Sequence, residues 1–153
     1  MTIIDIVNHT LFRIMKDIRR FILAQEEFDD YSIALNEIKN GRKESHWIWF
    51  IFPQLELLCR SDISVYYGIS GLDEAKTFLE NKTLNFRLRE ITSELLKHKD
   101  KDVRQIMGGL DAMKLRSSMT LFDIVSPHDI FEEVLDTFYD STRCMVTLTA
   151  CGR

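Results

Sequence analysis

One short segment of this sequence gathers side chains that could form a polar site. Residues 41–55, GRKESHWIWFIFPQL, hold a cation, a hydroxyl, an imidazole, an indole and an amide: Lys43, Ser45, His46, Trp49 and Gln54. Each buried ring removes about 150–250 Å² from water, so a run this aromatic is mainly a core element. A polar group among the rings needs a partner, because an unsatisfied buried one costs about 1–3 kcal/mol. We therefore expect His46 to lie embedded among the rings, with either a structural hydrogen bond or a ligand or acid–base role.

A second polar cluster lies far along the chain, in the segment KLRSSMTLF at residues 114–122. On a helix, Lys114, Ser117 and Ser118 are three and four positions apart and share a face. An ammonium and two hydroxyls on one face suit a phosphate or a carboxylate. The alternative is a solvated face whose serines bond back to their own helix. A serine nucleophile lacks support, because no G-x-S-x-G elbow is present.

Other chemistry-bearing patterns fail. The three cysteines, Cys59, Cys144 and Cys151, are an odd number without short paired spacing, which argues against disulfides and against a zinc site. The histidines show no metal-ligand spacing, and the glycines match neither a P-loop nor a dinucleotide fingerprint. We predict no metal and no cofactor. The net charge of −4 gives no general attraction to nucleic acid, so we expect no nucleic-acid partner.

The elements that must position these residues read as helices. Six glycines and two prolines leave few breaks, and apolar residues recur at helical spacing in one segment after another. The sequence predicts an all-α fold: a single compact domain of about six to seven helices. The segment WIWFIF has the composition of a buried strand but no partner strand, so we predict a helix or an irregular buried segment. Pro53 should restrict Phe52 to an extended conformation and end that element.

The chain divides into an N-terminal helical extension at residues 1–20, an all-helical domain at 21–140 and a cysteine-containing tail at 141–153. The extension carries one apolar stripe at helical spacing, from Ile4 to Phe21. This stripe is either a core face or the seam of a homodimer through residues 4–21. No apolar run approaches the roughly 20 residues of a membrane span, and the N-terminus lacks the pattern of a signal peptide. We expect a cytoplasmic protein without a membrane partner.

Four stretches together resemble a known family. GRKESHWIWFIFPQL (41–55), YGI (67–69), EA (74–75) and KLRSSMTLF (114–122) occur in the order and spacing of the family called domain of unknown function 1810. It is a group of small, mostly bacterial proteins, sometimes mislabelled calpastatin, and the resemblance runs from about Phe21 to Phe138. It implies an all-helical fold and no established reaction. The shared motifs select Gln25, Lys43, Ser45, His46, Trp47, Trp49, Gln54, Tyr67, Gly68, Lys114, Ser117 and Ser118. The chain departs from the family at ELLCRS and NKTLNF, and at both ends.

Three functions fit these observations, and whether the chain is an enzyme stays open. The first is a pocket for a small anionic or nucleotide-like ligand, with charge from Lys43 and Lys114, donors from Ser45, Ser117 and Ser118, stacking on Trp49 or Tyr67, and orientation by His46 and Gln54. The second is a hydrolase-type enzyme with His46 as general acid or base and a serine or a water as nucleophile. The third is a non-enzymatic interaction or scaffold module, in which both motifs hold the helices together.

Overall fold

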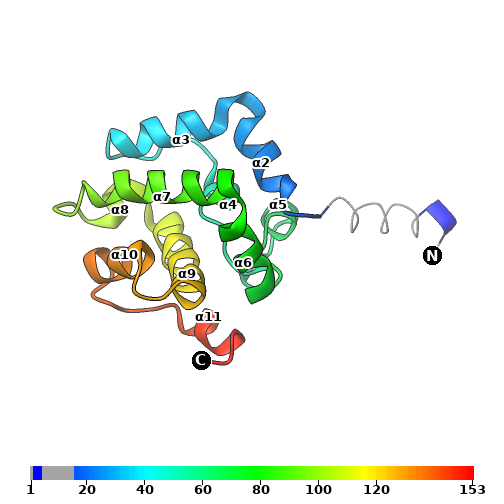
Figure 1. Cartoon of the computed structure of the whole chain (residues 1–153). Coiled ribbons are helices and arrows are strands. Elements are labelled where there is room, and N and C mark those ends of the chain that lie inside the picture. Colours follow the sequence, from blue (N-terminus) through cyan, green and yellow to red (C-terminus); the bar gives the residue numbers. More distant parts are fainter. Residues whose placement is uncertain (1, 5–15) are drawn as a thin grey trace.

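The computed structural model describes residues 2–4 and 16–153, and within these ranges the chain is all-helical (Figure 1). The helices, in chain order, are α2 (Arg19–Glu26), the 3-10 turn η1 (Glu27–Asp29), α3 (Asp30–Lys39), α4 (Ile48–Ile51), η2 (Glu56–Leu58), α5 (Asp62–Tyr66), α6 (Leu72–Glu80), α7 (Lys82–Leu96), α8 (Val103–Met107), α9 (Gly109–Val125), α10 (Ile130–Phe138) and α11 (Met145–Ala150).

Two long helices form the centre of the domain. α7 packs against α3, α6 and α10, and α9 packs against α6, α8, α10 and α11 (Figure 1). The inward stripe of α7 consists of Leu84, Leu88, Ile91 and Leu95, at the spacing of an amphipathic helix. α9 is buried on more than one side, at Leu115, Met119, Leu121 and Phe122. α9 therefore brings core and site residues together along one axis.

The all-α prediction is confirmed, but the described residues hold more helices than the six or seven expected. The difference lies in short helices that we did not predict as separate elements: α5, α8 and α11. Each has six residues or fewer, so its stability depends on packing rather than on its own propensity. The described residues contain no strand; Leu55 and Ile69 form a single parallel β-bridge.

The aromatic segment forms a short buried helix, as predicted. α4 covers Ile48–Ile51, and Phe52 then turns extended, with φ −124° and ψ 72°. Pro53 follows and prevents the helix from continuing. Trp47 and Phe52 are almost fully buried on either side of α4. The rings are thus mainly core, and α4 turns only one of them, Trp49, partly toward the surface.

Residues 16–20 and the C-terminal segment both pack onto the domain. The Lys16 ammonium pairs with Glu56 at 2.9 Å, and Arg20 is buried against the segment that precedes α6. Residues 16–20 therefore lie on the body of the domain, where we had placed an extension. α11 packs on α9 and buries Thr147, so the tail is also part of the fold. The proposed dimer seam falls largely on residues 5–15, outside the described residues.

The described residues contain no helix that is both long enough and apolar enough to cross a membrane.

Candidate functional site

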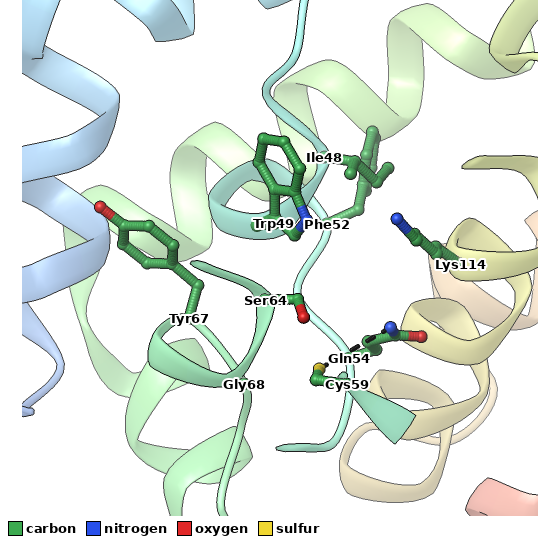
Figure 2. Close-up of a pocket in the computed structure, with 9 residues that line it drawn as sticks. All are labelled: Ile48, Trp49, Phe52, Gln54, Cys59, Ser64, Tyr67, Gly68 and Lys114. Atoms are coloured by element: carbon green, nitrogen blue, oxygen red, sulfur yellow. Dashed lines mark hydrogen bonds between the residues drawn. The ribbon is translucent and has the colours of Figure 1, made fainter. Parts of the chain in front are cut away.

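A small cavity lies between α4, α5 and α9, and we call it the aromatic pocket. Figure 2 shows side chains from the two sequence motifs meeting around it: Lys114 reaches in from α9, opposite Trp49 and Phe52. The nine lining residues are Ile48, Trp49, Phe52, Gln54, Cys59, Ser64, Tyr67, Gly68 and Lys114. Four of the predicted site residues thus line one cavity: Trp49, Gln54, Tyr67 and Lys114.

One wall of the pocket is built by a close approach of two backbone segments. Ile69 N–H donates to the Gln54 carbonyl and Glu56 N–H to the Ile69 carbonyl, both at 2.8 Å. Gly68 lies so close that a Cβ there would come within 2.5 Å of the Glu56 Cα. Only glycine fits this approach, which explains why the motif has one at this position.

A buried arginine supports the same wall from behind. The Arg20 side chain is fully buried and pairs with Glu74 at 2.8 Å. Its guanidinium also donates to the carbonyl oxygens of Tyr66 and Gly68, each at 2.8 Å. Because Tyr67 and Gly68 line the pocket, Arg20 holds two lining residues in place through their backbone. Its several acceptors are what allow a cation to be buried there.

Charge near the pocket is set by two lysines that share one carboxylate. The Lys43 ammonium, whose side chain is 6% exposed, pairs with Asp111 at 2.8 Å. Lys114 lies at 3.8 Å from the other oxygen of Asp111 and is a third exposed. Lys43 also lies over the Trp47 ring, and Lys114 over the Trp49 ring at 5.8 Å. Two ammoniums facing one carboxylate leave a surplus positive charge, and Lys114 is the more weakly paired of the two.

The aromatic rings of the pocket are held by their neighbours. Tyr67 packs edge-on against Phe50 at 5.4 Å and against Tyr66 at 4.8 Å between ring centroids. Burial raises the pKa of Tyr67, so its phenol stays neutral. Trp49 is half-buried and is the ring that Lys114 faces. The two rings can therefore offer a fixed apolar surface beside an ammonium.

The polar floor of the pocket is formed by Gln54, Cys59 and Ser64 (Figure 2). The Gln54 amide lies 3.8 Å from the Cys59 sulfur, and the thiol lies 3.4 Å from the Leu55 carbonyl. Burial raises the pKa of Cys59, against the influence of Gln54 and Ser64. Because the thiolate is the reactive form, Cys59 is a poor nucleophile in this setting. Gln54, in contrast, presents both an amide donor and an acceptor near Lys114.

The pocket is small. Its cavity volume is about 10 Å³, which is near the minimum that a single water molecule needs. A nucleotide does not fit inside this volume. What fits is the end of a polar group, with any larger portion of a ligand lying outside over the partly exposed Trp49 and Lys114.

Three predicted residues from the first motif lie away from the pocket. His46 is exposed rather than embedded among the rings, because the chain turns outward just before Trp47. Ser45 uses its backbone instead of its hydroxyl: its N–H donates to Glu37 at 2.6 Å, as does that of Glu44. The same Glu37 oxygen accepts the Trp47 indole N–H at 3.1 Å. Lys43, Ser45 and Glu37 therefore fix the loop that leads into α4.

Ser117 and Ser118 also lie away from the pocket. The Ser117 hydroxyl donates to the Met113 carbonyl at 3.2 Å, the bond back to its own helix that we gave as the alternative. It also lies 3.4 Å from the Cys144 sulfur. Ser118 is fully buried, and its hydroxyl has no hydrogen-bond partner among the described residues. Both serines are buried, Ser117 beside Cys144 at the start of α11, whereas Lys114 reaches toward α4.

Sequence reasoning missed several residues that build the site. Asp111 stands three positions before Lys114, a spacing that signals a helical ion pair. Glu37 and Arg20 gave no local signal, because their partners lie far away in sequence. Within the described residues, no group of three or more histidines, cysteines or carboxylates is placed to hold a metal ion.

Comparison with known proteins gives two matches of high coverage. The sequence model of the family described as "Protein of unknown function (DUF1810)" matches residues 15–151. Among solved structures, the fold matches the conserved hypothetical protein Rv1873 from Mycobacterium tuberculosis, with a TM-score of 0.85 and 36% sequence identity over 90% of this chain and 97% of that one. The comparison with curated proteins gives no match.

Proposed function

Since the chain belongs to the DUF1810 family of proteins of unknown function, we propose a function from its own geometry: the aromatic pocket binds the anionic end of a small molecule. The observation that carries this proposal is the position of Lys114. Its ammonium lies at the mouth of the cavity, over the Trp49 ring, with only a distant share of Asp111.

The charge balance supports an anion over a cation or a neutral ligand. Lys43 holds Asp111 at the shorter distance, 2.8 Å against 3.8 Å for Lys114. A carboxylate or phosphate oxygen beside Lys114 would therefore complete an ion pair that the protein leaves weak. The Gln54 amide could donate a second hydrogen bond to the same oxygen.

The volume of the pocket limits which part of a ligand can enter it. About 10 Å³ admits one oxygen atom of an anionic group, and the remainder must lie outside. The half-buried Trp49 offers that remainder a ring to stack on, in reach of Lys114. A nucleotide-like ligand would thus bind through one phosphate oxygen in the pocket and its base or sugar on the rim.

The tryptophan fluorescence of the chain tests this proposal, because Trp49 lines the pocket. We expect acetate, inorganic phosphate or adenosine monophosphate to change the emission in a saturable way, and adenosine without phosphate to have little effect. The variant Lys114→Met should weaken the binding about tenfold or more, since a hydrogen bond to a charged group contributes about 1.5–3 kcal/mol. Trp49→Phe should remove the signal.

Lys97→Met is a matched control, because Lys97 also stands three residues after its acidic partner, Glu94, on a helix far from the pocket. It should bind like the parent chain. Equal responses to adenosine and to adenosine monophosphate, or unchanged binding by Lys114→Met, would refute the proposal. So would the absence of any response to all three anions.

A scaffold or interaction module is the second candidate function, and the structural contacts of the motif residues favour it. Lys43, Ser45 and Ser117 all bind other parts of the fold, and Ser118 is buried. If this candidate is right, the parent chain and Lys114→Met will both give no response in any titration, and partners will depend on surface residues instead.

Catalysis by His46 has weaker support than either. The imidazole is exposed and does not line the aromatic pocket, so a reaction there would need a site formed by the substrate itself.

A further inference from the structure

A larger cavity lies on the other side of α9 from the aromatic pocket, between α8, α9 and α10. We call it the cationic groove; its main lining residues are Arg104, Ala112, Met113, Arg116, Phe138 and Tyr139. Arg116 stands four positions after Ala112 and three after Met113, so it shares one face of α9 with them. Its volume is about 470 Å³, within the range of about 300–1,000 Å³ that is typical of small-molecule sites.

Arg116 lacks a counterion in this groove. Its Nε atom is buried without a hydrogen-bond partner, and no carboxylate of the described residues pairs with its guanidinium. A buried N–H donor without an acceptor costs free energy, so native structures rarely leave one unpaired. The Arg116 guanidinium thus lacks an acceptor for its Nε–H group in the described part of the chain.

The acidic and phenolic groups of the groove cannot supply that acceptor. Asp102, the carboxylate that lines the groove, is bound to Arg104 at 2.8 Å. The Tyr139 hydroxyl donates to the Ala112 carbonyl, and burial raises the pKa of Tyr139, so the phenol stays neutral. An acceptor for Arg116 must therefore come from outside the described residues.

The remaining surface of the groove is apolar. Met113 is 60% exposed on α9, and Phe138 is half-buried at the end of α10. An inorganic anion would leave these side chains in water and most of the volume empty. A molecule that joins an oxyanion to an apolar body would cover both.

We propose that the cationic groove binds a small organic anion, with its carboxylate or phosphate on the Arg116 guanidinium and its apolar part against Met113 and Phe138. The planar fork of arginine suits either oxyanion, because two parallel N–H groups can donate to two oxygens. This site is separate from the aromatic pocket and does not depend on the function proposed for it.

Amide NMR of the full chain tests this proposal with benzoate and phenyl phosphate as probes, and with neutral benzamide as the uncharged counterpart. We expect one or both anions to shift the amides of Gly109 and Ala112 and the Nε–H of Arg116. Benzamide should shift them weakly. Arg116→Gln should lower the affinity about tenfold or more. Saturating shifts at these groups, with benzoate and phenyl phosphate compared, also distinguish a carboxylate site from a phosphate site.

Arg19→Gln is the control, because Arg19 is an exposed arginine that pairs with Asp17 and does not line the groove. It should bind like the parent. Arg116→Gln should melt within about 3 °C of the parent, since its Nε makes no hydrogen bond in the fold. If it unfolds, Arg116→Lys replaces it and should also bind more weakly than the parent.

Equal binding of benzamide and benzoate, full affinity in the Arg116 variant, or no shift in the groove would overturn the proposal. If anions shift the groove resonances but leave the Trp49 fluorescence unchanged, the result would count against the aromatic pocket alone.

Discussion

The aromatic pocket and the cationic groove lie on opposite faces of α9 and differ in how their cations are held. Beside the pocket, Arg20 and Lys43 are buried and paired, and Lys114 retains a share of Asp111. In the groove, Arg116 has no paired carboxylate among the described residues. The pocket has a volume of about 10 Å³ and the groove one of about 470 Å³.

This difference shows that a sequence motif can mark the supports of a site as readily as its binding groups. Only some of the motif residues line the pocket. Lys43 and Ser45 instead fix the loop before α4, and Gly68 permits a close backbone approach. The groove combines residues from three helices that no single stretch of sequence displays together. The larger volume favours the groove as a ligand site, whereas the convergence of the two sequence motifs favours the pocket. Three predictions on the supports of the pocket sharpen the contrast.

The largest effect is expected from Arg20→Met. The change removes the partner of Glu74 and leaves the carbonyl oxygens of Tyr66 and Gly68 without their donor. Breaking a buried ion pair in this way costs about 3–5 kcal/mol of unfolding free energy. Urea denaturation measures the loss, and Arg19→Met, whose side chain is 78% exposed, should change it by no more than about 0.5 kcal/mol. Similar midpoints for the two variants would show that the pocket wall does not depend on Arg20.

A smaller effect is expected from Gly68→Ala. The new methyl group would meet the Glu56 backbone at 2.5 Å, so the two segments of the wall must separate. Overpacking of this kind costs about 1–3 kcal/mol, and the emission of Trp49 should change because the wall faces it. Gly71→Ala is the control, since nothing lies within 4 Å of its Cβ position and its φ of 168° is extended. A Gly68→Ala chain with parental stability and emission would mean that the wall yields freely.

The smallest effect is expected from Glu37→Gln, and it depends on pH. Burial opposes ionisation of Glu37, but the N–H donors of Ser45, Glu44 and Trp47 outweigh it and lower its pKa. A carboxyl whose pKa is lower in the folded state adds stability above its ordinary pKa, about 4.3, and loses it as the pH falls through the folded value. The glutamine variant should lose about 1 kcal/mol at neutral pH, the difference between charged and neutral acceptors.

Once the pH falls below the lowered pKa of folded Glu37, the variant and the parent should converge in stability, because Glu37 is then protonated in both the folded and unfolded parent. Denaturation curves at several pH values measure this. Some acid sensitivity will remain in the variant, since hydrogen bonds from Arg89 lower the pKa of Asp129 as well. A stability difference that is constant from pH 7 to pH 3 would contradict the assigned role of Glu37.

Much of the fold could be predicted from the sequence, because burial and helical period coincide there. Leu84, Leu88, Ile91 and Leu95 form the stripe that was expected of α7. Helix ends were less predictable: Asp129, rather than Ser126, caps α10, and Ser126 instead bonds to that carboxylate at 2.6 Å. Two polar residues close together can each cap a helix, and local spacing alone does not choose between them.

The site could be predicted only in part. Trp49, Gln54, Tyr67 and Lys114 were expected together and line one cavity, since unusual residue types in two motifs pointed to them. His46 could not be placed correctly, because a ring-rich run does not show which way the chain turns at its first residue. Arg116 gave no signal at all, because a missing counterion becomes visible only when every possible partner has been located in space.

The carboxylate of Asp111 connects the pocket to the loop that leads into α4. When no anion is bound at Lys114, the Asp111 carboxylate faces two ammoniums, that of Lys43 at 2.8 Å and that of Lys114 at 3.8 Å. An anion that takes over Lys114 would leave Asp111 wholly to Lys43, and Lys43 anchors the turn before α4. By thermodynamic reciprocity, any change that stabilises that turn would also raise the affinity of the pocket for the anion. One shared counterion can thus couple anion binding in the pocket to the loop before α4 without any helix moving.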